Sequence, residues 1–472
     1  MNQLASLFVD LDGTLTKSDT LYEQIFLLLR TRPWALIRIP MWLARGGKAR
    51  LKHEVGVLAP LRVENLPYNA RVLDYISEHR TRGGDAYLAT AASSTTAHAV
   101  ANHIGLFDGV LCSDRESNLS GHAKLESIRA QHTQFSYIGN GNVDLPIWKE
   151  ADNKIIVNAP PPLNNKIVSQ GGVSLGKRDP VITNLLRACR PHQWLKNLLL
   201  FVPLLLAHEL TNVSALIDSF IGFLSFSFCA SGVYLLNDML DLEHDRGHPT
   251  KKKRPFAAGL LPIKTGVVAW MLITALGIGL AVSLNWNFLI ILLGYLLITN
   301  AYSLRLKKVI MLDVAVLAGL YTVRVVAGSE AIDVPLSFWL LSFSMFLFLS
   351  LALVKRYCEI ARLKLTSTAK AEGRGYEASD KWIIAQLGTS SGMLSVLVLA
   401  LYINSNVVAT SYSEPRFIWL ICPLLMYWIG RIWLLAHRGE VEEDPVVFAA
   451  KDKRTWLVGG LGALVFALAI TQ

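Results

Sequence analysis

Hydrophobic and polar positions divide the chain into two halves of different character. Up to about residue 157, short apolar runs alternate with polar segments, as in a soluble α/β domain. From Trp194 onward, long apolar runs dominate, of the length that a helix needs to cross a bilayer. The segment between the halves is rich in Pro, Asn, Gly and Ser, which indicates a linker. We therefore predict a soluble domain over 1–157, a linker over 158–186 and an all-α membrane domain over 187–472.

The membrane half holds about nine runs that are long enough to be transmembrane helices. Basic residues gather in the loops after the second, fourth, sixth and eighth runs, whereas the other loops are short or almost free of Lys and Arg. Because basic loops stay in the cytoplasm, we expect a cytoplasmic N-terminal domain and a C-terminus outside. We place the spans near 195–210, 215–236, 264–283, 287–303, 309–328, 334–354, 383–403, 416–436 and 456–471.

Composition agrees with a multi-pass membrane protein. The 472 residues are 52% hydrophobic and 17% charged, and the mean hydropathy is +0.37. The net charge of +10 fits basic cytoplasmic loops and a phosphorylated substrate. We predict no nucleic-acid partner, because no basic tract is interleaved with aromatic residues. The five cysteines are scattered and are expected to be reduced. No signal peptide is expected, since the first ten residues run into an acidic motif.

An acidic segment directly follows the second predicted span. Asn237, Asp241 and Asp245 are spaced four residues apart, so their side chains share one face of an α-helix. Three oxygen-bearing side chains at the mouth of a membrane helix suit Mg²⁺ that carries a diphosphate. Lys253 and Arg254 follow and are candidates for binding the remaining phosphate charge. The alternative is a solvated loop, but acidic residues at a membrane helix end are costly unless they have a function.

A second acidic pair lies near the N-terminus. The apolar run 6–9 predicts a buried strand, which delivers Asp10 and Asp12 at its end. Carboxylates separated by one residue point to the same side of an extended backbone. Gly13 and Thr14 then turn the chain away. With a metal beside it, a carboxylate at this position can attack phosphorus and form an aspartyl-phosphate.

This D-x-D-G-T sequence resembles motif one of the haloacid dehalogenase (HAD) phosphatase superfamily, and three further motifs follow in the family's order. Thr90 ends a predicted strand and matches motif two, and Lys124 matches the motif-three lysine that balances phosphoryl charge. Asn140 and Asp144 lie in motif four. The resemblance implies a Rossmann-like α/β fold with a helical cap near 21–80. It also implies the catalytic residues Asp10, Asp12, Thr90 and Lys124, and Mg²⁺ held by Asp10, Asp12, Asn140 and Asp144.

Two features of this domain leave alternatives open. The family usually has Asp where this chain has Asn140, and a carboxamide holds Mg²⁺ more weakly. An active phosphatase and an inactive domain kept for assembly are therefore both considered. In the cap, the aromatic and basic residues from Trp34 to Lys52 suit a segment lying on anionic lipid. They also suit an ordinary cap core with a solvated basic face.

The acidic segment after the second span, N-D-x-x-D-x-x-x-D followed by K-x-R-P, resembles the first signature of the UbiA prenyltransferase superfamily. The resemblance assigns Mg²⁺ and diphosphate to Asn237, Asp241 and Asp245, with Asp238 at the more variable position. Aromatic prenyltransferases of this superfamily usually carry a second D-x-x-x-D. This chain has Asp313 but Leu317 four residues later.

The K-R-x-x-E element that begins at Lys355 and the G-R-G-Y element at 373–376 instead look like the decaprenyl-phosphate phosphoribosyltransferase branch. That branch moves 5-phosphoribose from phosphoribosyl diphosphate (PRPP) to a polyprenyl phosphate. The alternatives are a prenyl diphosphate donor, as in aromatic prenyltransferases, and a membrane-anchored assembly protein. A bacterial inner membrane is the implied location. The candidate substrate-binding residues are Lys196, Lys253, Arg254, Tyr302, Lys307, Asp313, Arg324, Lys355, Arg356 and Glu359.

Overall fold

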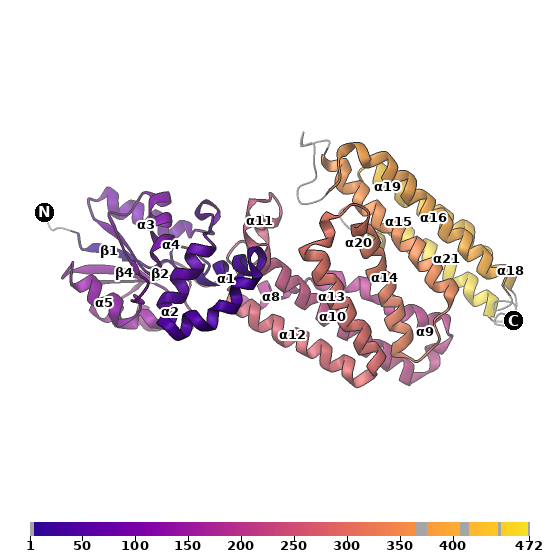
Figure 1. Ribbon diagram of the computed structural model, residues 1–472, viewed down its shortest axis with the longest axis horizontal. Coiled ribbons are helices and arrows are strands. Elements are labelled where there is room, and N and C mark those ends of the chain that lie inside the picture. Colours follow the sequence, from indigo (N-terminus) through magenta and orange to yellow (C-terminus); the bar gives the residue numbers. More distant parts are fainter. Residues whose placement is uncertain (1–3, 364–374, 406–414, 442–444, 471–472) are drawn as a thin grey trace. The chain divides into compact units, whose positions relative to one another are not determined.

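The computed structural model describes residues 4–363, 375–405, 415–441 and 445–470 (Figure 1). The chain forms two compact units, called here the first body and the second body. The first body comprises Met1–Cys189 and Tyr234–Met271, and the second comprises Arg190–Val233 and Leu272–Gln472. The first body therefore contains the acidic segment of the membrane half as well as the N-terminal domain.

A six-stranded parallel sheet forms the centre of the N-terminal domain, with strand order β3-β2-β1-β4-β5-β6. All four residues of β1 are buried, as expected for a strand between two neighbours with both faces covered. Phe8 of β1 pairs with Tyr87 of β2 and with Tyr137 of β4, so the ends of these strands meet at one edge. The strands are β1 (Ser6–Val9), β2 (Ala86–Ser93), β3 (Gly109–Ser113), β4 (Phe135–Gly139), β5 (Asn153–Ile156) and β6 (Val173–Ser174).

Side chains of β1 alternate between two hydrophobic cores. Leu7 and Val9 belong to one core and Phe8 to the other, because successive residues of a strand point to opposite faces. Helices α3 (Ala70–Thr81) and α4 (Ser94–Ile104) contribute to the first core. Helices α5 (His122–Arg129), α6 (Leu145–Glu150) and α7 (Pro161–Ser169) contribute to the second. The predicted Rossmann-like α/β fold is confirmed.

The segment 158–186 differs from the expected linker. It contains α7, strand β6, which pairs with β5, and the first part of α8 (Val181–Cys189). Leu163 and Ile167 of α7 are buried against the sheet. The Pro- and Asn-rich composition concealed these elements, because a helix of nine residues needs only two apolar side chains to dock.

Two helices and a 3₁₀-helix form the cap between β1 and α3. They are α1 (Thr20–Thr31), the 3₁₀-helix Pro33–Arg38 and α2 (Ile39–Leu58), which bends at Gly46 and Gly47. The cap has a small core of its own that includes Leu28, Trp42 and Val55. The cap helices end at Leu58, and α3 belongs to the layer that covers the sheet.

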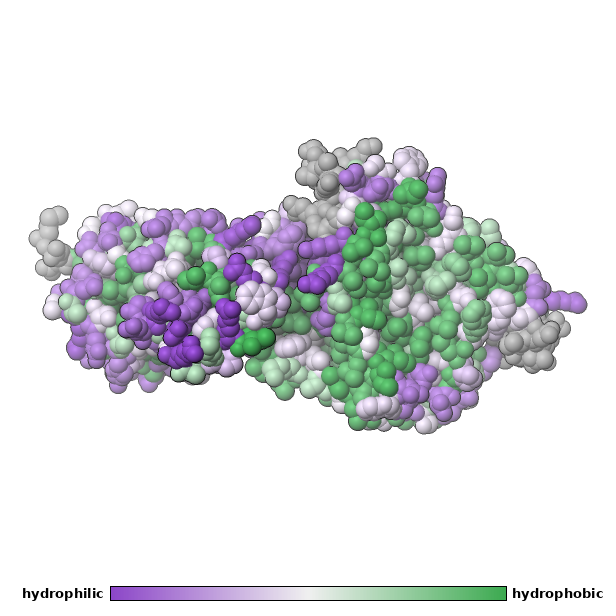
Figure 2. Space-filling view, viewed as in Figure 1, coloured by the Kyte–Doolittle hydropathy of each residue, from purple (hydrophilic) through white to green (hydrophobic). Residues whose placement is uncertain are grey.

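Long apolar helices make up the membrane half, and Figure 2 shows apolar surface over much of them. Within the described residues, seven helices are long and apolar enough to cross a membrane. They lie in α10 (Val213–Leu240), α12 (Ile263–Leu284), α13 (Trp286–Leu304), α14 (Leu312–Ala331), α15 (Phe338–Leu363), α16 (Lys381–Ile403) and the pair α18 (Pro415–Ile418) and α19 (Ile421–His437). Shorter helices are α9 (Val202–Leu206), α11 (Leu242–Gly247) and α20 (Pro445–Lys451).

The count of nine spans is therefore not confirmed. The first expected span, 195–210, forms a 3₁₀-helix, Pro191–Phe201, followed by α9. His208 then has φ +61°, which no α-helix accommodates. The last expected span is α21 (Lys453–Ile470), which is not among these seven helices.

Candidate active sites

The first candidate site lies in the first body, where β1, β2 and β4 end. Asp10 directly follows β1, and Lys124 of α5 donates a hydrogen bond to its Oδ1 over 2.7 Å. Thr14 Oγ1 donates to Oδ2 of the same carboxylate over 3.4 Å. Asp10 is 8% exposed and Lys124 is 3% exposed. The structure thus brings together the predicted nucleophile and the lysine that would balance its charge.

The other two predicted catalytic side chains are held by backbone groups. Oδ1 of Asp12 accepts a hydrogen bond from the Thr20 N–H, at the start of α1, over 2.7 Å. The hydroxyl of Thr90, fully buried in β2, accepts one from the Ala92 N–H over 3.0 Å. Both side chains therefore keep fixed orientations at the strand ends.

The carboxyls of this site lie close enough to repel one another, and Asp10 is buried. Burial raises the pKa of Asp10 to about 6, although Lys124 opposes the shift. Burial, and then the charge of Asp19, raise the pKa of Asp12 to about 7. Burial lowers the pKa of Lys124, but Asp10 and Asp144 outweigh it, so that pKa is raised. The site is short of positive charge, which is the condition that a bound cation relieves.

Motif four is organised by Asp144. Its Oδ2 accepts the N–H groups of Asn140 and Gly141 over 3.1 and 3.0 Å. Its Oδ1 accepts the Tyr137 hydroxyl over 2.8 Å, and that hydroxyl in turn accepts Lys124 Nζ over 3.1 Å. Because three donors occupy its two oxygens, Asp144 holds the loop and positions the lysine. Direct contact of Asp144 with a metal stays a prediction.

Asn140 packs directly against the motif-one loop. Gly13 has φ +76°, a conformation that favours glycine, and a Cβ there would lie 2.0 Å from Asn140 Nδ2. No group of three or more His, Cys, Asp or Glu side chains forms a metal site within the described residues. Asp10, Asp12 and the Asn140 carboxamide nevertheless supply hard oxygen donors in a site that is short of positive charge, and this set fits Mg²⁺.

Lys52 is a site residue that the sequence did not reveal. From α2 of the cap, its Nζ donates to the Ala91 carbonyl over 2.6 Å and to Asn118 Oδ1 over 2.8 Å. Burial lowers its pKa, and the charge of Asp12 opposes that shift. From the sequence, Lys52 is one of the basic residues of the cap, which suit either anionic lipid or a solvated face, and nothing in the local pattern distinguishes it from its basic neighbours.

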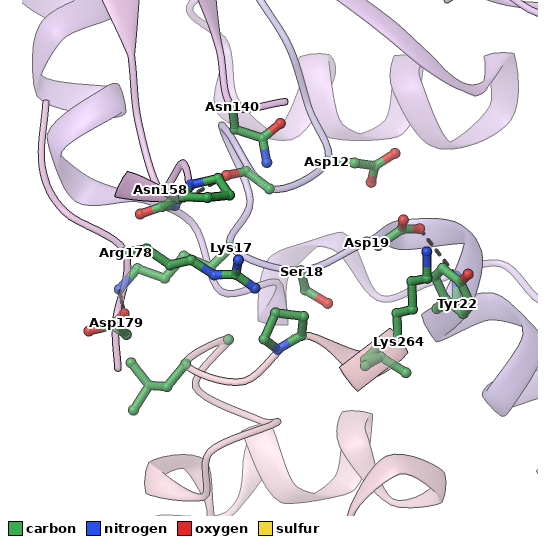
Figure 3. A pocket seen from close by; sticks show the side chains of 16 residues that line it. Asp12, Lys17, Ser18, Asp19, Tyr22, Asn140, Asn158, Arg178, Asp179 and Lys264 are labelled. Carbon is green, nitrogen blue, oxygen red and sulfur yellow. Dashed lines mark hydrogen bonds and ion pairs between the residues drawn. The ribbon is translucent and has the colours of Figure 1, made fainter. Parts of the chain in front are cut away.

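A cavity of about 280 Å³ opens beside Asp12 (Figure 3). One part of its wall comes from the motif-one loop, α1 and motif four. The other part comes from the end of the N-terminal domain and from the segment that follows the acidic motif of the membrane half. Its lining includes Asp12, Lys17, Tyr22, Asn140, Asn158, Arg178, Asp179, Gly259, Leu260 and Lys264.

The second candidate site is the acidic segment, also in the first body. Helix α10 ends at Leu240, and Asp241 precedes α11. The N–H of Asp241 still donates to the Asn237 carbonyl over 2.9 Å, and the N–H of Asp245 to the Asp241 carbonyl over 2.8 Å. The predicted four-residue helical spacing is therefore kept across the break. Asn237, Asp241 and Asp245 supply the oxygen donors that Mg²⁺ prefers, so this set also fits the metal.

Arginines offset the carboxylates of this segment. Arg254 Nη1 lies 2.7 Å from Asp245 Oδ2 and 3.2 Å from Asp238 Oδ1. Arg30 of the cap lies 2.9 Å from Asp241 Oδ1. Burial raises the pKa of Asp245, with Arg254 opposing the shift. Arg254, a candidate phosphate ligand in the sequence, thus pairs with the acidic motif here, whereas Lys253 is exposed.

The second body gathers three of the predicted substrate-binding residues. Asp313, fully buried in α14, accepts the Tyr376 hydroxyl over 2.6 Å and lies 2.6 Å from Arg356 Nη2. Arg356 also pairs with Glu359. Tyr376 comes from the G-R-G-Y element, of which Gly373 and Arg374 lie outside the described residues. The two sequence elements of the phosphoribosyltransferase resemblance therefore meet.

Arg324 lies inside the helix bundle of the second body. Its Nε donates to Asn197 Oδ1 over 2.8 Å and its Nη2 to the Tyr295 hydroxyl over 3.1 Å. It is 6% exposed, so these contacts tie helices together. Four other candidates are half-buried: Lys196, Tyr302, Lys307 and Lys355.

Each half of the chain matches a known protein family. Residues 198–469, more than half of the chain, match the model of the UbiA prenyltransferase family. The chain belongs to the UbiA prenyltransferase family. Residues 7–149 match the haloacid dehalogenase-like hydrolase family. The protein is thus a UbiA-type enzyme with a HAD-like phosphatase domain.

Three relatives show how far the likeness extends. An uncharacterized protein, y4nM, of Sinorhizobium fredii is 37% identical over 472 residues, 98% of this chain and 91% of the relative. The nodulation protein NoeC of Azorhizobium caulinodans is 37% identical over 56% of this chain and 86% of its own. The decaprenyl-phosphate phosphoribosyltransferase of Mycolicibacterium smegmatis is 35% identical over 38% of this chain and 58% of its own. The y4nM match spans both halves of this UbiA-type chain.

Proposed function

We propose that this UbiA-type enzyme transfers 5-phosphoribose from PRPP to a polyprenyl phosphate, and that its phosphatase domain then removes the 5-phosphate. The phosphoribosyltransferase relative supports PRPP as the donor. So does the Asp313–Arg356–Tyr376 cluster, because Asp313 is paired there with a cation and a hydroxyl and has no second carboxylate four residues later. The observation that carries the combined activity is that the phosphatase site and the acidic motif belong to one body. Direct contacts join them, including that of Arg30 with Asp241.

In the transfer step, an oxygen of the lipid phosphate forms a bond to C1 of the ribose. The bond from C1 to the diphosphate breaks, and its electron pair leaves with the diphosphate. Bound Mg²⁺ supplies charge neutralisation for this leaving group. Asn237, Asp241 and Asp245 would hold it, and Lys253 would add positive charge. The acceptor is already an anion, so the step needs no general base.

In the hydrolytic step, Asp10 attacks the phosphorus of the 5-phosphate and the bond to the ribose 5-oxygen breaks. Asp12 gives a proton to that oxygen and later takes one from the water that cleaves the aspartyl-phosphate. Lys124 and Thr90 hold the phosphoryl oxygens. Bound Mg²⁺ would offset charge beside Asp10, Asp12 and Asn140.

The donor is tested by offering purified protein the two candidates in turn. With Mg²⁺ and a polyprenyl phosphate, labelled PRPP should yield labelled lipid. With 4-hydroxybenzoate, a prenyl diphosphate should yield no prenylated product. The opposite pair of results would make this chain an aromatic prenyltransferase.

A further inference from the structure

We propose that the membrane half completes the phosphatase pocket, and that Lys264 and Arg178 bind a second anionic group of the substrate. This group is the phosphodiester that joins the sugar to its lipid. The inference rests on the proposed function for the identity of the substrate, and it names the residues that select that substrate.

The cavity beside Asp12 has a wall that the phosphatase domain does not supply. Gly259 and Leu260 come from the segment between the acidic motif and α12, and Lys264 comes from the first turn of α12. The close-up shows Lys264 extending from this wall toward Asp19 and Tyr22, with Arg178 on the other side of the space (Figure 3). Two cationic side chains therefore border the cavity that leads to the catalytic carboxylates.

The charges around the cavity leave these two cations available. Lys17 lies 3.9 Å from Asp179, and Asp19 Oδ1 accepts the N–H groups of Leu21 and Tyr22. Across the described ranges, neither Arg178 nor Lys264 forms an ion pair. Lys124, next to Asp10, already balances the charge of the phosphoryl group that Asp10 attacks. A ligand that contacts Lys124 and also Arg178 and Lys264 therefore carries a phosphomonoester and a second anionic group.

The size of the cavity points to the same ligand. Its volume of about 280 Å³ lies at the lower limit of small-molecule sites, which span ~300–1,000 Å³. Such a space holds a sugar phosphate headgroup and leaves a prenyl chain outside. The phosphodiester between the two then lies beside Arg178 and Lys264, which line the cavity.

A buried ion pair fastens this wall to the cap. Arg246, in α11 of the acidic segment, donates from Nη1 and Nη2 to the Glu23 carboxylate over 2.7 and 2.6 Å. The two side chains are only 5% and 2% exposed. Arg246 Nε also donates to the Ala257 carbonyl over 3.0 Å. Glu23 follows Tyr22 of the cavity, so this arginine connects the wall segment to the opposite side of the pocket.

Close packing at Gly259 shows that the wall is fitted to the motif-one loop. Gly259 has φ +69°, and a Cβ there would lie 2.6 Å from the Cβ of Lys17. Only glycine permits both this backbone conformation and this approach. The wall segment therefore packs directly against the motif-one loop and forms part of the pocket.

The test uses the full-length protein in lipid nanodiscs and two phosphatase substrates. One is p-nitrophenyl phosphate, which has a single anionic group. The other is a synthetic farnesyl phosphodiester of ribose 5-phosphate. Lys264→Ala and Arg178→Ala should each raise KM for the diester about tenfold or more, since each removes a charge-assisted hydrogen bond. Neither should change kcat for the diester, or KM for p-nitrophenyl phosphate, by more than about twofold.

Three further variants complete the experiment. Lys166→Ala removes an exposed lysine outside the cavity and should leave both substrates unaffected. Lys264→Arg should keep the low KM for the diester. Glu23→Gln, which weakens the hold on the wall, should raise KM for the diester alone.

Unchanged KM values in both alanine variants would overturn the inference. So would equal losses on the two substrates, because they would show general disruption. If wild type hydrolysed neither substrate, or if Asp10→Asn retained the activity, the proposed phosphatase function would fall and the inference with it.

Discussion

At the residue scale, the carboxylates of the phosphatase site and of the acidic motif carry negative charge that a bound cation would balance. Asn140 stands against Gly13 beside two carboxyls whose pKa values are raised, and its N–H donates to Asp144. In the acidic motif, Arg254 and Arg30 lie against the carboxylates. Single substitutions at these positions can therefore test metal binding and folding separately.

Asn140→Asp should strengthen Mg²⁺ binding at the phosphatase site. A third carboxylate raises the ligand charge, so the Mg²⁺ concentration for half-maximal hydrolysis of p-nitrophenyl phosphate should fall about tenfold. Without metal, the added repulsion should lower the melting temperature, and Mg²⁺ should restore it. Asn102→Asp, a matched change at an exposed position of α4, is the control. An unchanged metal requirement would exclude Asn140 from the metal site.

Asp241→Ala and Asp245→Ala should each reduce transfer at least roughly 100-fold, because a metal-held leaving group contributes several kcal/mol to the transition state. Hydrolysis of p-nitrophenyl phosphate by the same variants would show that the protein still folds. Asp218→Ala, on the same helix as Asn237 but outside the motif, should transfer normally. Near wild-type transfer in either motif variant would remove the proposed diphosphate site.

At the scale of elements, the cap presents two different faces. Trp42 is 4% exposed in the cap core, whereas Trp34 is 56% and Ile37 is 82% exposed. Arg38 lies over the Trp34 ring at 5.2 Å. Aromatic, apolar and basic side chains on one outer face suit a membrane interface, and lipid contact by the cap stays a prediction.

Ile37→Asp should therefore slow hydrolysis of the lipid-linked substrate in anionic vesicles roughly fivefold or more, because it removes apolar contact with the bilayer. Turnover of soluble p-nitrophenyl phosphate should not change. Val57→Asp alters another exposed apolar residue of the cap and is the matched control. Equal turnover of the lipid by both variants would place the cap away from the membrane.

Local patterns predicted the parts of the sites that lie close together in sequence. The sequence predicts Asp10, Thr90 and Lys124 because a motif surrounds each of them: Asp10 follows β1, Thr90 lies in β2 and Lys124 lies in the first turn of α5. Lys52, Arg178 and Lys264 were not found, because their roles arise from contacts between distant segments. The helix and strand hidden in 158–186 were missed because the packing of Leu163 and Ile167 depends on a sheet formed elsewhere.

At the scale of the whole molecule, chain connectivity constrains how the membrane is crossed. The N-terminal domain and the acidic segment contact each other through Glu23 and Arg246, so they lie on the same side of the membrane. Only α10 among the seven long helices separates them, and one crossing would place them on opposite sides. We infer that the 3₁₀-helix Pro191–Phe201 and α9 cross as well. Laid end to end, their 11 and 5 residues would reach about 30 Å, the thickness of the hydrocarbon core.

This inference predicts that the turn between α9 and α10 faces outside. In Leu210→Cys, a membrane-impermeant thiol reagent should label intact cells at this exposed position. Lys166→Cys should be labelled only after the cells are opened. If Leu210→Cys also reacted only in opened cells, the segment before α10 would not cross.

The central claim is that one chain both makes a phosphoribosylated lipid and removes its 5-phosphate. The most direct measurement is the mass of the lipid product formed from PRPP and a polyprenyl phosphate by wild type and by Asp10→Asn. Wild type should yield the polyprenyl-phosphoryl ribose, and the variant the same lipid heavier by one phosphate. Identical phosphorylated lipids from both proteins would contradict the account.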